Sequence, residues 1–203
     1  MTYRKRKNAG AYKLTYQKGE TMTLLAWPLE QNHIRRSSGN NAFGMVRNGG
    51  TRPHQGWDLV ASPMTSCYAI ADGKIERVTV RNDLGKVILL EFEHRGQKLY
   101  ATYCHLSLAL VVEKALVKRG DKIGYTGNTG NAASMRGMDQ HLHFEIRTIP
   151  DPGFGLGGRI DPARLYGRAP IGWTFFEGHG QKVVTASASG LKIPGVNVRE
   201  RIE

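Results

Sequence analysis

The stretch His141-Leu142-His143-Phe144-Glu145-Ile146-Arg147 alternates polar and apolar residues without interruption. Successive side chains of a β-strand point to opposite faces, so this pattern predicts a strand with its apolar residues on one face and its polar residues on the other. His141 and His143 then lie about 7 Å apart on the same face, close enough to serve one site. One interpretation of this pair is a metal site. The other is the solvated polar face of an edge strand.

A second histidine pattern lies upstream, in His54-Gln55-Gly56-Trp57-Asp58. Imidazole and carboxylate groups are both good zinc ligands, and this spacing can bring them together on one helical turn or around a tight bend. The neighbouring Pro53 and the internal Gly56 favour the bend. The pair is weak evidence by itself, because His and Asp occur at this spacing by chance in many proteins.

The remaining histidines carry less information. His105, in Tyr103-Cys104-His105-Leu106-Ser107, ends a strand-like run, and functional side chains are common where a strand gives way to a loop. A lone histidine in such a place is usually structural. The other three have no partner pattern and are expected to be surface residues; they are His33, His94 and His179.

Short strand-like runs rich in Val, Ile, Leu, Tyr and Phe dominate the middle of the chain, separated by turn residues. These runs are Cys67–Ile70, Lys74–Arg81, Lys86–Glu93 and Lys98–Tyr103. The turns at 82–85 and 94–97 have hairpin spacing, which predicts a mostly β fold with an antiparallel sheet and little helix. The stretch Leu106–Val117 is equally compatible with a single helical turn and with a strand. Glycines at 124, 127 and 130 predict tight turns, and those at 153–158 a flexible loop.

Half of the net charge of +12 lies in the first 18 residues. Six basic residues precede the first acidic one, Glu20, and such charge attracts any polyanion, whether nucleic acid, anionic lipid or cell wall. No apolar run reaches the roughly 18–20 residues of a membrane span, and no signal peptide is evident behind the basic start. A nucleic-acid-binding function rests on this charge alone, since the chain has no C2H2 motif and no basic strand with interleaved aromatic residues.

Two further groups have alternative interpretations. Glu145 shares a face with the histidines and could act as a general base, but its position two residues past a histidine favours a structural role, paired with a nearby Arg or Lys. Cys67 and Cys104 are too far apart for a CxxC metal motif, and each occupies a position where a small apolar residue would fill a strand. Two buried thiols are therefore expected in preference to a disulfide.

The order of these motifs resembles the lysostaphin-type (LytM-like) zinc metalloendopeptidases of peptidoglycan. The HxxxD pattern, the strand that ends in His-Leu-Ser, the Gly-rich turn and the His-Leu-His-Phe-Glu strand follow one another as in that family, over about residues 24–167. The supporting pieces are Trp27-Pro28, Phe43-Gly44 with Arg47, 69–75, Val117–Asp121, 123–130 and Ile160-Asp161-Pro162. Each piece is weak alone, and their joint order is specific.

The resemblance implies a LytM-like antiparallel β-sheet core with long loops around a zinc groove. The zinc endopeptidase domain is then expected at 23–167. The segment 1–22 has no apolar periodicity and is expected to be a basic arm, and 168–203 is expected to be a C-terminal extension that can pack on the domain through its aromatic residues. Carried over by position, the resemblance implies that the zinc (Zn2+) ligands are His54, Asp58 and His143. The unliganded pair that faces the water and the scissile carbonyl is His105 and His141.

The implied function is hydrolysis of peptide bonds in peptidoglycan. The first choice of bond is the D-Ala to diamino-acid cross-link, because the separate wall-binding domain that secreted glycyl-glycine endopeptidases often carry is not visible here. The alternatives are a glycyl-glycine bridge endopeptidase and a non-catalytic wall-binding regulator of the same fold, although the chain retains all five site residues. Without an evident signal peptide, a phage lysin or a secreted or injected antibacterial effector is expected. It would act in the periplasm or wall of the target bacterium, with a delivery apparatus or a cognate immunity protein as a further partner.

Overall fold

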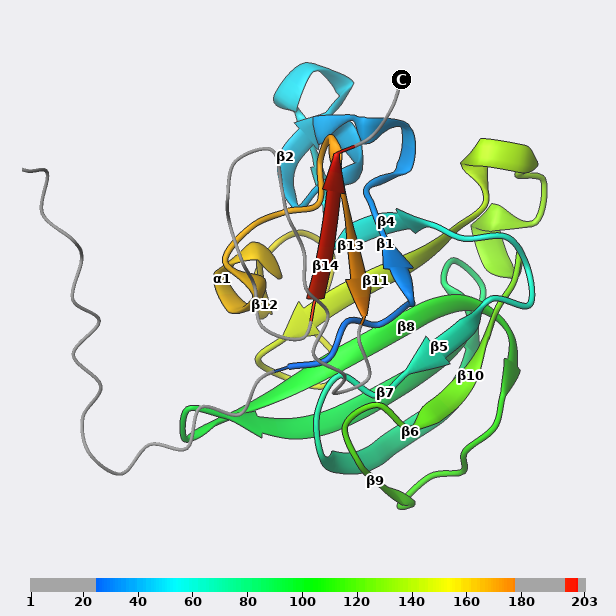
Figure 1. Cartoon of the computed structure of the whole chain (residues 1–203), viewed down its shortest axis with the longest axis vertical. Coiled ribbons are helices and arrows are strands. Elements are labelled where there is room, and N and C mark those ends of the chain that lie inside the picture. The colour runs from blue at the N-terminus through cyan, green and yellow to red at the C-terminus, as the bar shows by residue number, and fades with distance from the viewer. Residues whose placement is uncertain (1–24, 178–195, 201–203) are drawn as a thin grey trace, which may run out of the picture.

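A computed structural model describes residues 25–177 and 196–200 (Figure 1). The arm expected at 1–22 and His179 lie outside these residues, as does most of the chain after residue 177. Within the described part, antiparallel strands dominate, and the α-helical content is the single turn α1 (Ala163–Tyr166). Five short 3-10 turns accompany it, at Arg35–Ser37, Gly39–Asn41, Asn48–Gly50, Gly130–Ala132 and Gly137–Asp139. The predicted mostly β, antiparallel fold is confirmed.

A nine-stranded sheet forms the body of the protein, with the order β12-β11-β8-β7-β6-β9 along its main path. Off this path, β10 pairs with β5 and β8, and β4 pairs with β11. In chain order the strands are β4 (Trp57–Val60), β5 (Ser66–Tyr68), β6 (Gly73–Arg81), β7 (Gly85–His94), β8 (Gln97–Ala109), β9 (Leu116–Val117), β10 (Lys122–Thr126), β11 (His141–Arg147) and β12 (Arg159–Ile160).

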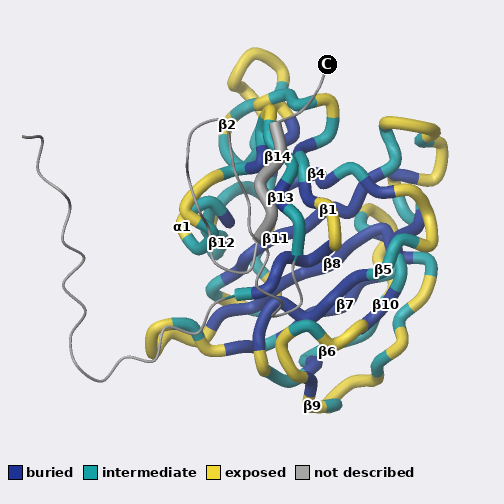
Figure 2. Tube along the Cα trace, in the orientation of Figure 1, coloured by how far each residue is buried: buried dark blue, intermediate teal, exposed yellow. Residues whose placement is uncertain are grey.

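The centre of this sheet is a meander of three long strands. β6 pairs with β7, and β7 with β8, through the hairpin turns predicted at 82–85 and 94–97. Their inward residues include Ile75, Leu90 and Leu99, all buried in one hydrophobic core. Figure 2 shows this burial as a continuous dark region along β7, β8 and β11, with exposure concentrated in the connecting loops. Antiparallel neighbours joined by short turns need only local chain reversals, which explains why this part was predictable.

The stretch Leu106–Val117 contains no helical turn. β8 continues through Ala109, a loop follows, and β9 begins at Leu116. The sequence left a helical turn and a strand as alternatives. The strand is correct at both ends of the stretch, and the middle is a loop. Among the described residues, no helix has the length and apolar character needed to cross a bilayer.

Two smaller sheets complete the fold. β2 (Gly44–Arg47) pairs with β3 (Arg52–His54) close to the first histidine pattern. β13 (Trp173–Glu177) lies between β1 (Gln31–Asn32) and β14 (Val196–Glu200), as Figure 1 shows.

The first part of the C-terminal extension packs into the core. Phe175 is 1% exposed, and its ring stacks on Trp27 with a centroid distance of 4.8 Å. Trp27 also stacks on Tyr166 of α1 at 4.3 Å. The buried side chain of Asn32 donates hydrogen bonds to the carbonyl oxygens of Leu29 and Phe175. The expected packing through aromatic residues is thus confirmed for Phe175, whereas the domain boundaries stay a prediction.

Candidate active site

Three side chains from three strands meet at one end of the sheet. His54 ends β3, Asp58 belongs to β4, and His143 to β11. His54 Nε2 lies 3.0 Å from Asp58 Oδ1, and His143 Nδ1 lies 2.8 Å from the same oxygen. One ligand atom from each residue falls within 4.8 Å of the others, and all three residues are buried. The structure therefore brings together the three residues expected to bind zinc.

The bend between His54 and Asp58 depends on Gly56. A Cβ atom at this position would overlap the main-chain carbonyl of Phe144 in β11. Because only glycine lets the two backbones approach so closely, the chain can turn at 55–56 and enter β4 against β11. The pairing of β4 with β11 then places Asp58 directly opposite His143. The bend favoured by the sequence is present, and its reason is this close approach.

Strand β11 lies inside the sheet, flanked by β4 and β12 on one side and β8 on the other. Its seven residues are all buried, which excludes a solvated edge strand. The predicted alternation is present, because Leu142, Phe144 and Ile146 belong to the hydrophobic core. The polar face of β11 instead lines the site.

Each candidate ligand is oriented by a second hydrogen bond. His54 donates from Nδ1 to the carbonyl oxygen of Ala42 at 2.8 Å, which turns its Nε2 toward the site. His143 donates from Nε2 to Glu145 Oε1 at 3.0 Å, which turns its Nδ1 toward the site. Arg47 donates to Asp58 Oδ2 at 2.6 Å and leaves Oδ1 facing the two imidazoles. Such outer partners fix ring orientation at metal sites, and two imidazoles with one carboxylate suit zinc with an open fourth position.

The electrostatics of the three groups also fit a cation. Burial alone would raise the pKa of Asp58, but the hydrogen bond from His143 and the close approach of His54 hold this pKa well below its ordinary value. Burial alone would lower the pKa of His143, but hydrogen bonds with Asp58 and Glu145 raise it to about 9. Without a metal, the ring of His143 is therefore protonated and positively charged beside the Asp58 carboxylate. A divalent cation would take the place of that positive charge.

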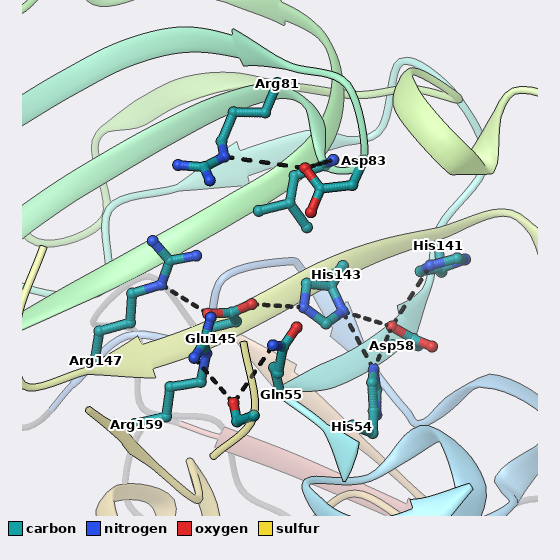
Figure 3. A network of polar contacts seen from close by, with 12 residues as sticks. His54, Gln55, Asp58, Arg81, Asp83, His141, His143, Glu145, Arg147 and Arg159 are labelled. Atoms are coloured by element: carbon teal, nitrogen blue, oxygen red, sulfur yellow. Dashed lines mark hydrogen bonds and ion pairs between the residues drawn. The ribbon is translucent and has the colours of Figure 1, made fainter. Parts of the chain in front are cut away.

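Glu145 has the structural surroundings that the sequence favoured. Its Oε2 accepts hydrogen bonds from Arg147 Nε at 2.7 Å and from Arg159 Nε at 2.9 Å, while Oε1 accepts from His143. Figure 3 shows this chain of contacts running from Arg147 through Glu145 and His143 to Asp58. Both carboxylate oxygens of Glu145 are thus occupied by hydrogen bonds. These bonds hold Glu145 in place to orient the ring of His143.

His105 does not end its strand, which corrects the sequence interpretation. It lies inside β8 at a β-bulge, where Tyr103 pairs with Ile88 and Leu106 with Lys86, so that one residue of β7 faces two of β8. The backbone of His105 has a φ of 60°. Strict alternation would place His105 on the same face as the buried Tyr103. The bulge turns its side chain to the opposite face, toward the candidate ligands.

His105 and His141 stand side by side next to the three candidate ligands. Their ring centroids are 5.2 Å apart, and the ring of His105 is 6.0 Å from that of His143. His105 Nδ1 donates to the carbonyl of Thr129 at 2.9 Å, and His141 Nδ1 to the carbonyl of Asp139 at 2.7 Å. Both rings therefore keep Nε2 for the site. Burial lowers the pKa of His105 to about 4 and also lowers that of His141.

The other residues singled out by the sequence lie elsewhere. Cys67 and Cys104 are buried free thiols, as expected. His33 and His94 are half-buried, in partial disagreement with their expected surface position. The contacts of Arg47 with Asp58 and of Arg159 with Glu145 were not foreseen, because nothing in the local sequence shows which carboxylate an arginine will reach.

A groove runs across the site, with a cavity of about 580 Å³ lined by all five residues: His54, Asp58, His105, His141 and His143. Two imidazoles and one carboxylate in an open groove form a ligand set of the kind that catalytic zinc sites use. The chain belongs to peptidase family M23, whose sequence profile matches residues 52–162, the segment that contains all five residues. Members of this family are zinc metallopeptidases.

Curated relatives include an uncharacterised metalloprotease of Haemophilus influenzae, 33% identical over 133 residues, which are 64% of this chain and 26% of the relative. The peptidoglycan DD-endopeptidase ShyB of Vibrio cholerae is 35% identical over 95 residues, 46% of this chain and 20% of the relative. The murein hydrolase activator NlpD of Escherichia coli is 34% identical over 122 residues, 60% of this chain and 27% of the relative. The chain thus spans between 20% and 27% of the length of these relatives.

Solved structures with the same fold include the catalytic domain of the antimicrobial peptidase lysostaphin from Staphylococcus simulans. It is 27% identical with a TM-score of 0.50, over 69% of this chain and 93% of that one. The structure of LytU is 25% identical with a TM-score of 0.51, over 78% of this chain and 94% of that one. The predicted lysostaphin-type fold is confirmed.

Proposed function

We propose that this chain is a zinc-dependent endopeptidase that hydrolyses peptide bonds of bacterial peptidoglycan. In this proposal His54, Asp58 and His143 hold the zinc ion, and His105 and His141 handle protons. The observation that carries it is the pair of unliganded imidazoles, each fixed at Nδ1 by a main-chain carbonyl and each presenting Nε2 beside the ligand set. A site that only bound metal would not need two such oriented bases.

Zinc, when bound, supplies a Lewis acid that polarises the substrate amide and makes water a nucleophile near neutral pH. The chain's own residues then manage the protons. With its lowered pKa, an imidazole such as His105 is neutral at pH 7 and able to accept a proton at Nε2. One of the two histidines accepts the proton of the attacking water at Nε2. The same ring, now protonated, or the other histidine after it has received this proton, then stabilises the oxyanion or protonates the leaving amine.

The first choice of substrate is the D-Ala to diamino-acid cross-link between stem peptides. The similarity to the DD-endopeptidase ShyB supports this choice, although it covers only 46% of this chain. A glycyl-glycine bridge is the alternative, supported by the fold shared with lysostaphin's catalytic domain. Mass spectrometry of muropeptides released from walls with direct cross-links and from walls with glycine bridges separates the two.

Three substitutions test the assignment of roles. His105→Ala and His141→Ala should leave the zinc content near stoichiometric while abolishing hydrolysis of purified walls, whereas Asp58→Ala should lose both. His94→Ala, at the far end of β7, is the matched control and should keep both. Zinc is measured by elemental analysis and hydrolysis by loss of wall turbidity. Normal activity in His105→Ala would contradict the assignment.

A non-catalytic regulator is the second candidate, favoured by the match to the activator NlpD. It predicts that the zinc-loaded chain leaves purified walls intact and increases hydrolysis only when another wall hydrolase is added. The presence of all five site residues in the groove favours the enzyme.

We propose that the protein acts in the bacterial wall or periplasm. It would reach this place either as a phage lysin or as a secreted or injected antibacterial effector. An immunity protein in the producing cell would be a partner in the second case. Expression of the chain with and without a periplasmic leader in a test bacterium checks this, because lysis should require delivery to the periplasm.

A further inference from the structure

The groove has a large excess of positive charge. Its lining contains two carboxylates, Asp58 and Asp83, and Asp58 is already a candidate metal ligand. It also contains six arginines: Arg35, Arg47, Arg52, Arg81, Arg147 and Arg159. Guanidinium groups match the planar geometry of carboxylates, so a groove with this composition favours a substrate with anionic groups.

Next to His143, two guanidinium groups share the single carboxylate of Glu145. Arg147 and Arg159 both donate through Nε to the same oxygen, Glu145 Oε2. The second oxygen of Glu145 accepts a hydrogen bond from His143. The side chains of Arg147 and Arg159 are only 5% and 4% exposed. One carboxylate cannot neutralise two guanidinium groups, and this end of the groove therefore keeps a fixed positive charge.

Arg81, at the end of β6, lines the same groove as Arg147. The charges of both arginines act on Asp151, which places the two guanidinium groups at one end of the groove. The carboxylates near Arg81 are 3.5 Å away at Asp151 and 3.9 Å away at Asp83. Strong charge-assisted hydrogen bonds are shorter, about 2.7–2.9 Å. Asp151 is held by Arg77 at 2.7 Å instead. Arg81 is 47% exposed, and its polar contacts within the described residues are these two ion pairs and a long hydrogen bond of 3.5 Å from Nη1 to Asp151 Oδ1. Its guanidinium has five N–H donors and can therefore take another carboxylate.

An exposed aromatic residue stands next to these arginines. Phe154 is 87% exposed and lines the groove. Its loop is held by Arg159, whose Nη1 donates to the carbonyl oxygens of Gly153 and Gly155 at 2.9 and 3.0 Å. The same arginine therefore connects the loop of Phe154 to Glu145. An apolar ring beside a guanidinium cluster suits an aliphatic arm that ends in a carboxylate.

We infer that Arg81, Arg147 and Arg159 form a carboxylate-binding subsite, with Phe154 as its apolar wall, for a stem-peptide residue that carries a free carboxylate on an aliphatic arm. The inference rests on the proposed function in taking its ligand from peptidoglycan. The diamino acid of directly cross-linked walls has such an arm, whereas a glycine bridge has no side-chain carboxylate. The subsite therefore selects the direct cross-link.

The test is a binding measurement that does not depend on hydrolysis. Isothermal titration calorimetry compares three soluble stem tetrapeptides on the zinc-loaded full chain: one with the free carboxylate on the diamino acid, one with a carboxamide there, and one with only its C-terminal carboxylate amidated. Loss of a charge-assisted contact should weaken binding of the diamino-acid amide about tenfold, while the C-terminal amide binds like the parent peptide. Equal affinity for the first two peptides, or a loss confined to the third, overturns the inference.

Two variants locate the effect in the groove. Arg81→Gln should reduce the ratio of the two affinities to about one. Arg95→Gln removes the same charge from the exposed turn between β7 and β8 and should keep the full ratio. Arg147 and Arg159 are left unchanged because they also hold Glu145. A preference that survives in Arg81→Gln contradicts the subsite, provided that circular dichroism shows a folded variant.

Hydrolysis of cross-linked walls, measured separately, distinguishes the two proposals. Binding preference without hydrolysis would leave the subsite intact and overturn the endopeptidase function. Hydrolysis without a binding preference would support the endopeptidase function and overturn the subsite.

Discussion

His143 donates a hydrogen bond from Nε2 to Glu145 Oε1 at 3.0 Å, although the two residues are only two positions apart on the same strand. Strand alternation places their side chains on one face, and the arginines behind Glu145 keep its carboxylate directed at the ring. The candidate ligand atom of His143 is therefore Nδ1, whereas that of His54 is Nε2. This orientation comes from the outer hydrogen bonds and leads directly to a first prediction.

Glu145→Gln should lower the zinc affinity of the chain about 10- to 100-fold, the usual cost of removing an outer partner of a metal ligand. Glutamine keeps the size of the side chain but loses the charge that orients and polarises His143. Competition with a chromogenic zinc chelator measures the affinity. Glu93→Gln, an exposed change at the end of β7, is the control and should leave the affinity unchanged. Equal affinities in the two variants would show that Glu145 does not support the metal site.

Gly56→Ala should destabilise the fold and lower zinc binding together. The new methyl group collides with the carbonyl of Phe144, and relief of such a collision typically costs about 1–3 kcal/mol or more. Any relief must separate β4 from β11, which moves Asp58 away from His143. Thermal unfolding and zinc content report the two effects. Gly39→Ala is the matched control, because nothing lies within 4 Å of a Cβ there; if both variants melt alike, the close approach has no energetic weight.

Phe175→Ala should destabilise the protein by about 3–5 kcal/mol, the range for removing a buried aromatic ring. The ring fills the core against Trp27, so its loss leaves a cavity. Urea unfolding followed by tryptophan fluorescence gives the free energy. The exposed Phe154→Ala should change stability by no more than about 0.5 kcal/mol. A small effect of Phe175→Ala would mean that the extension is dispensable for the fold, and a truncation after residue 167 would then remain stable.

The two thiols should be unreactive in the folded protein. Burial raises the pKa of Cys67 and of Cys104 well above the ordinary value, so the reactive thiolate is scarce at pH 8. A colorimetric disulfide reagent should detect almost no free thiol in native buffer and both thiols in guanidinium chloride. Fast reaction in native buffer would contradict their burial, and a single reactive thiol after unfolding would contradict the pair of free cysteines.

Local patterns were enough to predict several parts of the molecule. The alternation in 141–147 predicted which side chains of β11 enter the core, and the turns at 82–85 and 94–97 predicted the meander of β6, β7 and β8. Each of these features depends on residues a few positions apart, where strand geometry and turn chemistry act directly.

The position of His105 shows where this reasoning stops. Alternation alone assigns His105 to the face of Tyr103, in the core. The structure places it on the other face, because a bulge in β8 gives His105 a positive φ and its backbone N–H bonds to the carbonyl of Leu84. A bulge depends on how two strands pair, and their pairing is not written in the sequence of either strand.

The sequence by itself determined the types of the chemical groups and their local directions: imidazoles on one face of a strand, a bend at Gly56, and thiols in apolar runs. Only the tertiary structure decided that these groups share one site. The register of β4 against β11 sets Asp58 opposite His143, and Arg47, Glu145 and the carbonyl of Ala42 then orient the ligands. The physical reason is that strand register and side-chain partners result from packing the whole core, which involves residues distant in sequence.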